Sequence, residues 1–580
     1  MAVIGIDLGT TNSLCAVYHH NQAEIIPNVF GEYLTPSCVY IKDDKFIVGK
    51  IAREKSVLEP ENCASLFKRT MGTDKKYVLD GKSYSSGELS SFVVKQLIYD
   101  AEQYLGEKVE EVIISVPAYF DAKQREATRH IGTLLGVKTE RLVNEPSAAA
   151  LACHTGDSYE TFAILDFGGG TLDISIVDCF ENVVSILSIA GDNHLGGSDF
   201  DRAIALYFMA ENKLSLDSLP EDRKMAVLRE AERVKILLGE KESAVMYLQV
   251  NGKQYETVIT RDILKDICMP VLEKMKPVIL EAVQGSGMRP SDLDSMILVG
   301  GSCCMPLVQE YLEELLNLDI LAGKEMEKLV AEGLAIYTGI HERNAEVKDL
   351  VLTDICPFSL CTSVYNEVDA QKSLSRVVIS RNTILPVTKT VNLCALKEKQ
   401  KEIHIHVYQG ENMYAKDNLL LGEIIIPIPT NHKGQEEFEL TYSYDINSML
   451  FVEVRILSTN EVYSYQIGDT HTLEKVRNRQ AIESIERVSL QLSRQADFDA
   501  VIERMNRLYK EMHEEERESF QAFAQQFVRE FRSLNNIRKK MELVDKVNEM
   551  MDHYEQERTF VEEELFSNEE DGNQGGGFYA

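Results

Sequence analysis

The stretch of residues 163–177 constrains the fold most, because one apolar run enters a turn of three glycines and a second apolar run leaves it. Two apolar runs joined in this way predict a buried β-hairpin. Glycine has no Cβ and tolerates positive φ, so successive N–H groups of such a turn can converge on an anion. Thr171 adds a hydroxyl donor, and Asp166 and Asp173 flank the turn where a cation accompanying a phosphate would need oxygen ligands. The stretch therefore predicts a nucleotide-phosphate loop, with an ordinary tight hairpin as the alternative.

The same pattern occurs with different residues at the start of the chain. An apolar strand at 3–6 runs into Asp7, a Gly-Thr-Thr turn follows, and a second apolar strand returns over 13–18. A third apolar strand at 295–299 ends in Gly-Gly-Ser, with a helix predicted from Pro306. Two matching hairpins far apart in the chain suggest a duplicated fold in which each half supplies one phosphate loop. The combination strongly favours phosphate binding over a simple hairpin.

These segments resemble the actin-like ATPase superfamily and, within it, the seventy-kilodalton heat-shock family of DnaK-type chaperones. The resemblance covers the chain well to about residue 460 and more weakly beyond it, and it implies an α/β actin-like (ribonuclease-H-like) ATPase domain of two lobes, followed by an antiparallel β-sandwich and an α-helical lid. The acidic C-terminal tetrapeptide of eukaryotic cytosolic members is missing, which favours a divergent, specialised bacterial member. The motifs that carry the resemblance are residues 5–13, 116–120, 143–150, 166–173 and 194–201.

The residue pattern changes along the chain in step with these domains. From residue 355 apolar and polar residues alternate with a period of two, which is typical of an antiparallel β-sandwich. Residues 479–497 and 500–566 show helical spacing, with a stripe of phenylalanines, and predict a helical lid over the sandwich. The stripe is Phe520, Phe523, Phe527 and Phe531. We expect an ATPase domain at 1–345, a linker at 346–354, the sandwich at 355–470, the lid at 471–566 and a disordered tail at 567–580.

The resemblance implies that ATP and Mg²⁺ bind between the two lobes, with K⁺ as a further candidate ion. Asp7 and Asp166 would hold Mg²⁺ mainly through water molecules. The expected nucleotide-binding residues are Asp7, Gly9, Thr10, Thr11, Asn12, Gly168, Gly169, Gly170, Gly196, Gly197, Glu232, Lys235, Gly300, Gly301 and Ser302.

The resemblance also assigns the chemistry. Lys68 and Thr171 would contact the γ-phosphate, because a positive charge there stabilises the negative charge that develops in phosphoryl transfer. Glu145 and Asp173 would lie around the attacking water, and Asp166 completes the catalytic set. Without the resemblance, Lys68 would be read as a surface lysine and Glu145 as a helix N-terminal glutamate favoured by the dipole.

Residues 202–300 look like a helix-rich insertion, with apolar positions at helical spacing. The resemblance places Glu232 and Lys235 of this insertion at the adenosine end of the nucleotide. Two positions depart from the family: Gly239 replaces a common serine, and Cys304 replaces a common arginine that stacks on adenine. A missing guanidinium removes a cation–π contact. We therefore predict weaker nucleotide binding and faster nucleotide exchange than in typical members.

Further residues would couple the ATPase to the client. The linker would dock on the ATPase domain in one state and leave in the other, although a plain edge strand is an alternative. The sandwich would bind an extended apolar peptide, with Leu440 at a pocket position that could equally be core. The resemblance assigns Pro117 and Arg125 to an allosteric relay, and Arg141, Asn144 and Asp354 to the J-domain contact, where Asp354 near Arg141 would allow a charge-paired dock.

Composition limits the partners. A formal net charge of −32 argues against nucleic acid or an anionic membrane as a partner. Eleven scattered cysteines show no metal-ligand spacing, so reduced thiols in the cytoplasm are expected. Neither a signal peptide nor a membrane-spanning run is visible. We expect a monomer that binds unfolded or extended polypeptides and a J-domain co-chaperone, with a nucleotide-exchange factor as a further candidate partner.

The leading hypothesis is an ATP-driven chaperone that binds and releases apolar polypeptide segments. A sugar or polyol kinase of the same superfamily is an alternative, but such kinases end with the second lobe. A filament-forming actin relative would lack the long C-terminal extension. A peptide-binding module with a vestigial or weak ATPase would not need an intact set of Asp7, Lys68, Glu145 and Asp166.

Overall fold

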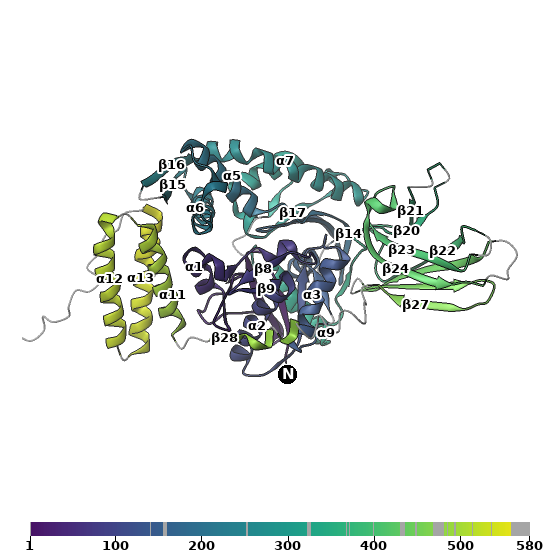
Figure 1. The fold of residues 1–580 in the computed structure, drawn as a ribbon, viewed down its shortest axis with the longest axis horizontal. Helices are drawn as coiled ribbons and strands as arrows, with labels where there is room; N and C mark the ends of the chain where they lie inside the picture. The colour runs from purple at the N-terminus through teal and green to yellow at the C-terminus, as the bar shows by residue number, and fades with distance from the viewer. Residues whose placement is uncertain are drawn as a thin grey trace, which may run out of the picture.

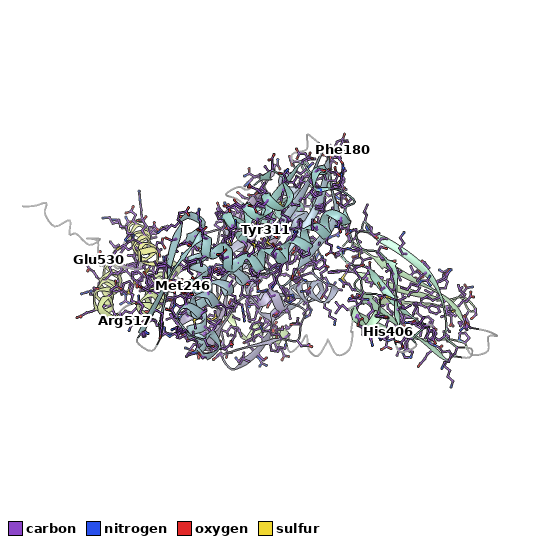
Figure 2. The ribbon with its side chains drawn as sticks, turned by 90° about the horizontal axis from the view of Figure 1, so that it is seen from above. Phe180, Met246, Tyr311, His406, Arg517 and Glu530 are labelled. Atoms are coloured by element: carbon purple, nitrogen blue, oxygen red, sulfur yellow. The ribbon has the colours of Figure 1, made fainter. Side chains whose placement is uncertain are left out.

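The structure is a computed structural model of the chain. A domain of two lobes occupies the middle, with the β-sandwich at one end and helices α11 (Ala496–Glu511), α12 (Glu514–Ser533) and α13 (Ile537–Glu557) at the other (Figure 1). Figure 2 shows the same arrangement from above, with Arg517 and Glu530 at the helical end and His406 at the sandwich end. The structure describes residues 2–139, 141–154, 159–250, 253–321, 326–366, 368–369, 372–397, 400–429, 435–446, 449–467, 481–483, 485–491, 495–512, 514–534 and 536–557. Within these residues, we find no helix with the length and apolar character needed to span a bilayer.

The first lobe is built on a sheet with the order β11-β10-β1-β2-β3, to which β4 adds by pairing with β2. Strand β1 runs antiparallel to β2 and parallel to β10, so the chain turns back at the Gly-Thr-Thr loop between β1 and β2. The strands are β1 (Ala2–Asp7), β2 (Asn12–His19), β3 (Gln22–Ile26), β4 (Thr35–Pro36), β10 (Val109–Val116) and β11 (Leu142–Asn144).

The second lobe repeats this arrangement with the order β18-β17-β12-β13-β14-β19. Strand β12 is antiparallel to β13 and parallel to β17, as β1 is to β2 and β10. The predicted hairpin duplication is therefore present in the fold. The strands are β12 (Glu160–Phe167), β13 (Leu172–Phe180), β14 (Val183–Asp192), β17 (Ser295–Val299), β18 (Ile320–Leu321) and β19 (Val351–Thr353).

Helices α4 (Glu145–Cys153) and α9 (Leu329–His341) pack against each other beside the two sheets. Their backbones approach so closely that a Cβ at Gly333 would lie 1.7 Å from the Ala148 carbonyl oxygen, so only glycine fits there. Helix α3 (Ala122–Leu135) begins at a capping box in which the Asp121 carboxylate accepts the Gln124 N–H.

A small subdomain covers one edge of the first lobe. Its sheet has the order β28-β6-β5-β7, and a separate hairpin is formed by β8 and β9. Phe46, Phe92 and Tyr84 form its fully buried aromatic centre. The elements are β5 (Val39–Lys42), β6 (Lys45–Val48), β7 (Cys63–Ala64), β8 (Lys76–Leu79), β9 (Lys82–Ser85), β28 (Ser489–Leu490), α1 (Lys50–Leu58) and α2 (Ser86–Leu105).

The predicted helix-rich insertion covers the second lobe. Helices α5 and α6 pack with α7 over a single large apolar core, as the helical spacing predicted. The sequence did not lead us to expect the hairpin β15–β16 between α6 and α7. The elements are α5 (Gly197–Glu211), α6 (Glu221–Glu240), β15 (Ser243–Val250), β16 (Lys253–Thr260), α7 (Arg261–Gly285) and α8 (Pro306–Leu316).

Between the two-lobed domain and the sandwich, β19 of the linker pairs in parallel with β14. The sandwich that follows consists of the sheets β21-β20-β23-β24 and β22-β25-β26-β27, and all their pairs are antiparallel as predicted. The strands are β20 (Leu360–Val364), β21 (Leu374–Ile379), β22 (Val387–Cys394), β23 (Glu402–Gln409), β24 (Leu419–Pro427), β25 (Glu437–Tyr444), β26 (Leu450–Ile456) and β27 (Val462–Gln466).

The C-terminal helices form a three-helix bundle, and the predicted phenylalanine stripe lies in its core. The structure differs from the expected lid over the sandwich, because the bundle packs against α1 and contacts β15 of the two-lobed domain. The reason is electrostatic: α11 presents Arg507 and Glu503 to Glu54 and Lys55 of α1. The expected lid boundary also shifts, since residues 481–491 join the first lobe through β28. The predicted tail at 567–580 lies outside the described residues.

Candidate nucleotide-binding site

A cleft of about 1050 Å³ opens between the two lobes, and both hairpin loops line it. Gly170, Gly196 and Asp173 are the predicted site residues that lie behind this lining. The predicted residues that line it are Asp7, Gly9, Thr10, Thr11, Asn12, Lys68, Glu145, Asp166, Gly168, Gly169, Thr171, Gly197, Glu232, Lys235, Gly300, Gly301 and Ser302.

The two phosphate loops face each other across very short distances. A Cβ at Gly169 would lie 1.8 Å from Thr11 Oγ1, and a Cβ at Gly170 would lie 2.8 Å from Thr10 Cγ2. The loop is further fixed by Ser302, whose hydroxyl donates to the Gly168 carbonyl at 2.8 Å. The glycines are therefore needed because the two loops approach each other closely, which supports the phosphate-loop interpretation over a simple hairpin.

At the floor of the cleft, Lys68 Nζ donates to Glu145 Oε1 at 2.7 Å. Only 4% of the Lys68 side chain and 7% of the Glu145 side chain are exposed, so neither charge is screened by bulk water. Lys68 lies on a short 3₁₀ turn after Leu66, whose φ of 55° directs the chain into the cleft. The interpretation of Lys68 as a surface lysine is therefore wrong.

Carboxylates crowd around this pair. Burial, followed by the charge of Glu145, raises the pKa of Asp7 to about 6, although Ser115 donates to it at 2.7 Å. Burial and then Glu145 also raise the pKa of Asp173 to about 7 and hold that of Asp166 well above its usual range. Four carboxylates facing a single lysine are suited to a bound cation.

The donor set therefore fits Mg²⁺, which prefers oxygen ligands and keeps several of its water molecules. Asp7 and Asp166 line the cleft beside both phosphate loops, where a cation could contact carboxylate and phosphate together. Asp173 lies further back, where its Oδ1 accepts the Tyr119 N–H at 3.0 Å and its buried Oδ2 makes no hydrogen bond within the described chain.

The residues expected to hold adenosine are paired with other side chains. Glu232 Oε2 accepts from Arg53 Nη2 of α1 at 2.5 Å, and Lys235 Nζ lies 2.7 Å from an Asp201 carboxylate oxygen. Burial alone would raise the pKa of Glu232, but the charges of Arg53 and Lys235 lower it. A nucleotide entering here would exchange these ion pairs for its own hydrogen bonds.

The two positions that depart from the family do not line the cleft. Cys304 is exposed at the end of the turn that carries Gly300–Ser302, and Gly239 lies at the end of α6 with open space beside it. The apolar side of the cleft is instead lined by Met225, Leu228 and Ile236. The prediction of weaker nucleotide binding thus rests on the side chain of Cys304, which is shorter than the arginine that is common at this position in the family.

Sequence reasoning missed a residue that bridges the lobes. Arg69 of the first lobe donates to the Ser198 hydroxyl at 2.7 Å and to the His194 carbonyl at 2.6 Å, both in the second lobe. Arg69 follows Lys68 directly, and Ser198 belongs to the motif at residues 194–201. Neither position signals the contact by itself, because the pairing is set only by the closed fold.

Comparisons with known proteins show the family of the chain. A family model described as Hsp70 protein matches residues 3–80 and 74–571. The chain belongs to the Hsp70 family. A protein named chaperone protein DnaK from Methanothermobacter thermautotrophicus is 36% identical over 498 residues, which are 83% of this chain and 82% of the relative. One of the same name from Thermosipho africanus is 34% identical over 489 residues, which are 82% of this chain and 81% of the relative.

Three residues that resemblance to the Hsp70 family assigned to coupling form one hydrogen-bonded chain. Arg125 donates to the Ala118 carbonyl at 2.9 Å and to Asn144 Oδ1 at 2.7 Å, and Asn144 Nδ2 donates to Asp354 Oδ2 at 2.6 Å. Ser147 also donates to Asp354, at 3.1 Å. Asp354 is thus held by neutral donors. Of the other assigned residues, Pro117 is buried directly after β10, and Arg141 is half-buried just before β11.

The peptide-pocket position lies inside the sandwich. Leu440 is fully buried, pairs with Val391 and Val454 on the neighbouring strands and belongs to the sandwich core. The structure therefore assigns it the core position that the sequence left open, and a client contact at Leu440 stays a prediction.

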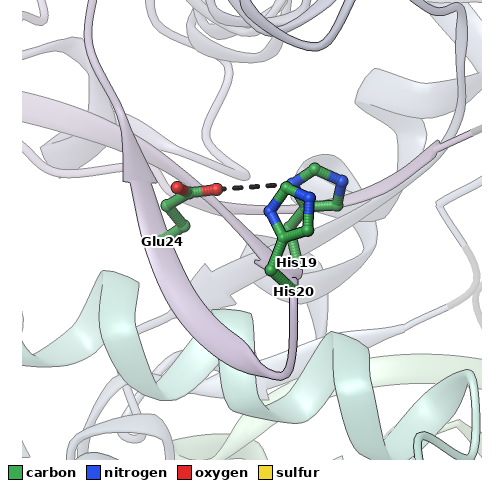
Figure 3. Close-up of side chains that lie close together, drawn as sticks. All are labelled: His19, His20 and Glu24. Atoms are coloured by element: carbon green, nitrogen blue, oxygen red, sulfur yellow. Dashed lines mark ion pairs between the residues drawn. The ribbon is translucent and has the colours of Figure 1, made fainter.

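A second group of candidate ligands lies on the exposed turn between β2 and β3. His19, His20 and Glu24 place three ligand atoms within 4.8 Å of one another (Figure 3). His19 Nδ1 forms an ion pair with Glu24 at 3.5 Å. His19 and His20 are exposed and Glu24 is only partly buried, so these contacts by themselves assign no metal to the turn.

Proposed function

We propose that this chain is an ATP-dependent molecular chaperone that binds and releases unfolded or extended apolar polypeptide segments. The observation that carries the proposal is the buried Lys68–Glu145 pair among three further carboxylates, in a cleft lined by two matching glycine loops. Membership of the Hsp70 family and the names of the two relatives support the same activity.

In the proposed reaction the two loops hold the phosphates through backbone N–H groups and the Thr10, Thr11 and Thr171 hydroxyls. Mg²⁺, held mainly through water by Asp7 and Asp166, would neutralise phosphate charge. Lys68 would stabilise charge on the γ-phosphate in the transition state.

The attacking water would lie between Glu145 and Asp173. Asp173, whose pKa burial and then Glu145 raise to about 7, can hold a proton near neutral pH and so suits the role of acceptor for the water's proton. Glu145 is fixed by Lys68 and would orient the water.

Nucleotide and client sites would communicate through the linker. The chain Arg125–Asn144–Asp354 connects the end of β10 to the linker, and β19 adds the linker to the sheet of the second lobe. We infer that hydrolysis weakens this docking, releases the linker and slows client exchange. Arg141, Asn144 and Asp354 would form the J-domain contact, and Pro117 would act with Arg125 in the relay.

The proposed setting is a cytoplasmic monomer served by a J-domain co-chaperone and, as a further candidate, a nucleotide-exchange factor. All eleven cysteines are free thiols, which supports a reducing compartment. The formal charge of −32 supports a role without nucleic acid.

Single-turnover ATP hydrolysis, measured with and without a J-domain protein and an apolar peptide, tests the proposal. We expect slow basal hydrolysis that both additions accelerate. Acceleration by a small sugar instead would favour the kinase alternative. Binding of peptide without any hydrolysis would favour the vestigial ATPase.

A further inference from the structure

The C-terminal bundle contacts both sides of the cleft mouth. On the first-lobe side, Lys55 of α1 lies 2.8 Å from Glu503 of α11. On the second-lobe side, Arg517 at the start of α12 donates to Gln249 of β15 at 3.1 Å. The bundle thus spans the opening between the lobes.

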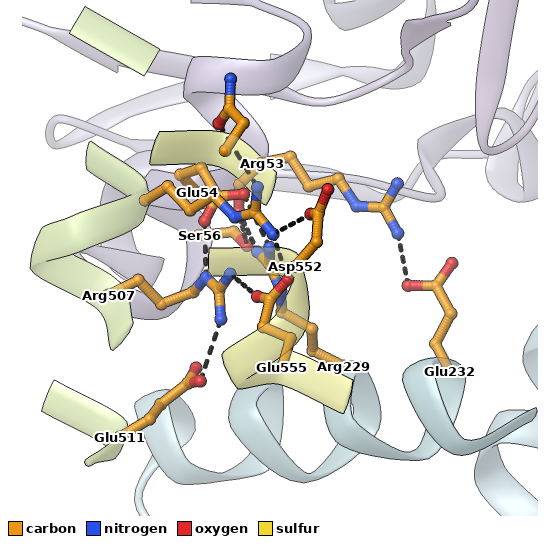
Figure 4. Close-up of polar contacts among 11 residues, drawn as sticks. Arg53, Glu54, Ser56, Arg229, Glu232, Arg507, Glu511, Asp552 and Glu555 are labelled. Carbon is orange, nitrogen blue, oxygen red and sulfur yellow. Dashed lines mark hydrogen bonds and ion pairs between the residues drawn. The ribbon is translucent and has the colours of Figure 1, made fainter. Parts of the chain in front are cut away.

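A buried charge network lies at the centre of this contact (Figure 4). Glu54 of α1 accepts from Arg229 of α6 at 2.7 Å and from Arg507 of α11 at 2.5 Å. Arg507 also donates to Glu511 at 2.9 Å and to Glu555 of α13. Only 3% of the Arg507 side chain is exposed, so its charge depends on these carboxylates in place of water. One glutamate therefore joins the first lobe, the second lobe and the bundle.

The network begins one residue from Arg53, which lines the cleft. Arg53, the neighbour of Glu54, forms the 2.5 Å ion pair with Glu232, and Arg229 donates to the Arg53 carbonyl at 3.0 Å. Arg53, Arg229 and Glu232 all line the nucleotide cleft. A shift of α1 relative to α6 would disturb the cleft wall and the bundle contact together.

Strand β28, which precedes the bundle in the chain, forms part of the first lobe. Strand β28 pairs in parallel with β6, where the Ser489 N–H donates to the Asp44 carbonyl at 3.0 Å. Ile485 and Val488 are each 1% exposed within the first-lobe core. This anchor keeps the bundle at the cleft, at the end of the molecule opposite the sandwich (Figure 1).

We propose that the bundle is a clamp on the nucleotide cleft, which holds α1 and α6 together and slows nucleotide release. The proposal rests on the proposed nucleotide-binding function. A nucleotide held between two lobes leaves when the lobes separate, and separation here would pull Arg229 from Glu54 or Arg507 from its carboxylates. Leaving a buried charge without its partner is costly, so the closed arrangement persists longer with the bundle docked.

A charge swap at the bundle contact tests this clamp in the full-length chain. ADP with a fluorescent ribose label would be bound with Mg²⁺ and chased with excess ATP in a stopped-flow instrument. Lys55→Glu and Glu503→Lys alone should each accelerate ADP release, and the double variant should restore the parent rate. Arg507→Met should accelerate release on the order of tenfold, as expected for contacting charges.

The matched control is Arg538→Met, which removes an arginine of the same bundle that is 88% exposed and pairs with Glu542. It should leave the release rate unchanged. The double charge swap shows that any acceleration in the single variants arises from the contact itself, since misfolding would not be rescued by a second substitution.

The outcomes separate the clamp from the function beneath it. Labelled ADP that binds the parent but leaves every variant at the parent rate would overturn the clamp and leave the proposed function standing. Acceleration without rescue in the double swap would also overturn it. A parent chain that binds no labelled ADP would overturn the proposed function and the clamp with it.

Discussion

Replacing Lys68 by methionine would remove one charge from the centre of the cleft while keeping most of the side-chain volume. In the structure Lys68 and Glu145 are 2.7 Å apart, and their side chains are 4% and 7% exposed. The substitution leaves Glu145 buried without a cation, among carboxylates whose pKa values are already raised. We expect Glu145 to take up a proton in place of remaining charged.

The cost of that proton sets the magnitude. With an ordinary glutamate pKa of about 4.3 and about 1.36 kcal/mol per pH unit, protonation costs about 3.7 kcal/mol at pH 7 and about 1 kcal/mol at pH 5. The Lys68→Met protein should therefore lose more of its free energy of unfolding at pH 7 than at pH 5, by about 2.7 kcal/mol. Hydrolysis should fall by about 10²-fold or more, because a donor to the developing charge is lost.

Urea unfolding at the two pH values and single-turnover hydrolysis measure the two effects separately. Lys68→Met with Glu145→Gln removes both charges, so it should recover much of the stability while hydrolysis stays low. Lys82→Met is a surface control, since Lys82 is 45% exposed and pairs only with Asp44 at the surface. Hydrolysis at the parent rate in Lys68→Met would refute the catalytic assignment, and a loss of stability independent of pH would refute the electrostatic reasoning.

Four further outcomes are expected. Because burial raises the pKa of Asp7 to about 6 and that of Asp166 well above its usual range, binding of Mg²⁺ with nucleotide at pH 6 should release on the order of one proton, seen by calorimetry in buffers of different ionisation enthalpy. For the same reason the stability that Asp7 contributes to the nucleotide-free protein is full below about pH 4 and is lost as the pH rises through about 6. Cys304→Arg should tighten ADP binding by about 0.5–1 kcal/mol through a cation–π contact; unchanged or weaker binding would contradict it. Leu352→Asp should put a charge into the half-buried linker strand and make the linker more sensitive to limited proteolysis, and equal sensitivity would show that the strand contributes little to docking.

The sequence was sufficient where a feature is local. The hairpin loops, the capping box at Asp121 and the alternation of the sandwich each depend on residues that are close together in the chain. The carboxylates of the cleft could be placed for the same reason, since Asp7 is the last residue of β1 and Asp166 is the last but one of β12. The duplication predicted the remaining geometry, because two copies of one phosphate loop are expected to face each other across the site.

Contacts between distant segments could not be predicted. Nothing in the sequence around Glu232 indicates Arg53 as its partner, because the two residues come together only in the folded arrangement of the two lobes. The bundle shows the same limit: helical spacing identified the apolar stripe of α12, but it does not say which surface the charged face of α11 meets. Complementary charges on α1 decided that, and they placed the helices beside the cleft.

Two pairs of neighbouring residues connect the cleft to the rest of the molecule. Asn144 holds the linker residue Asp354 while Glu145, the next residue, accepts from Lys68. On the opposite side Glu54 accepts from the bundle, and its neighbour Arg53 pairs across the cleft. Neighbouring residues share a planar peptide unit, so a displacement of one member moves the other. The nucleotide site can thus sense the linker through the start of α4 and the bundle through α1, which are two separate elements of the first lobe.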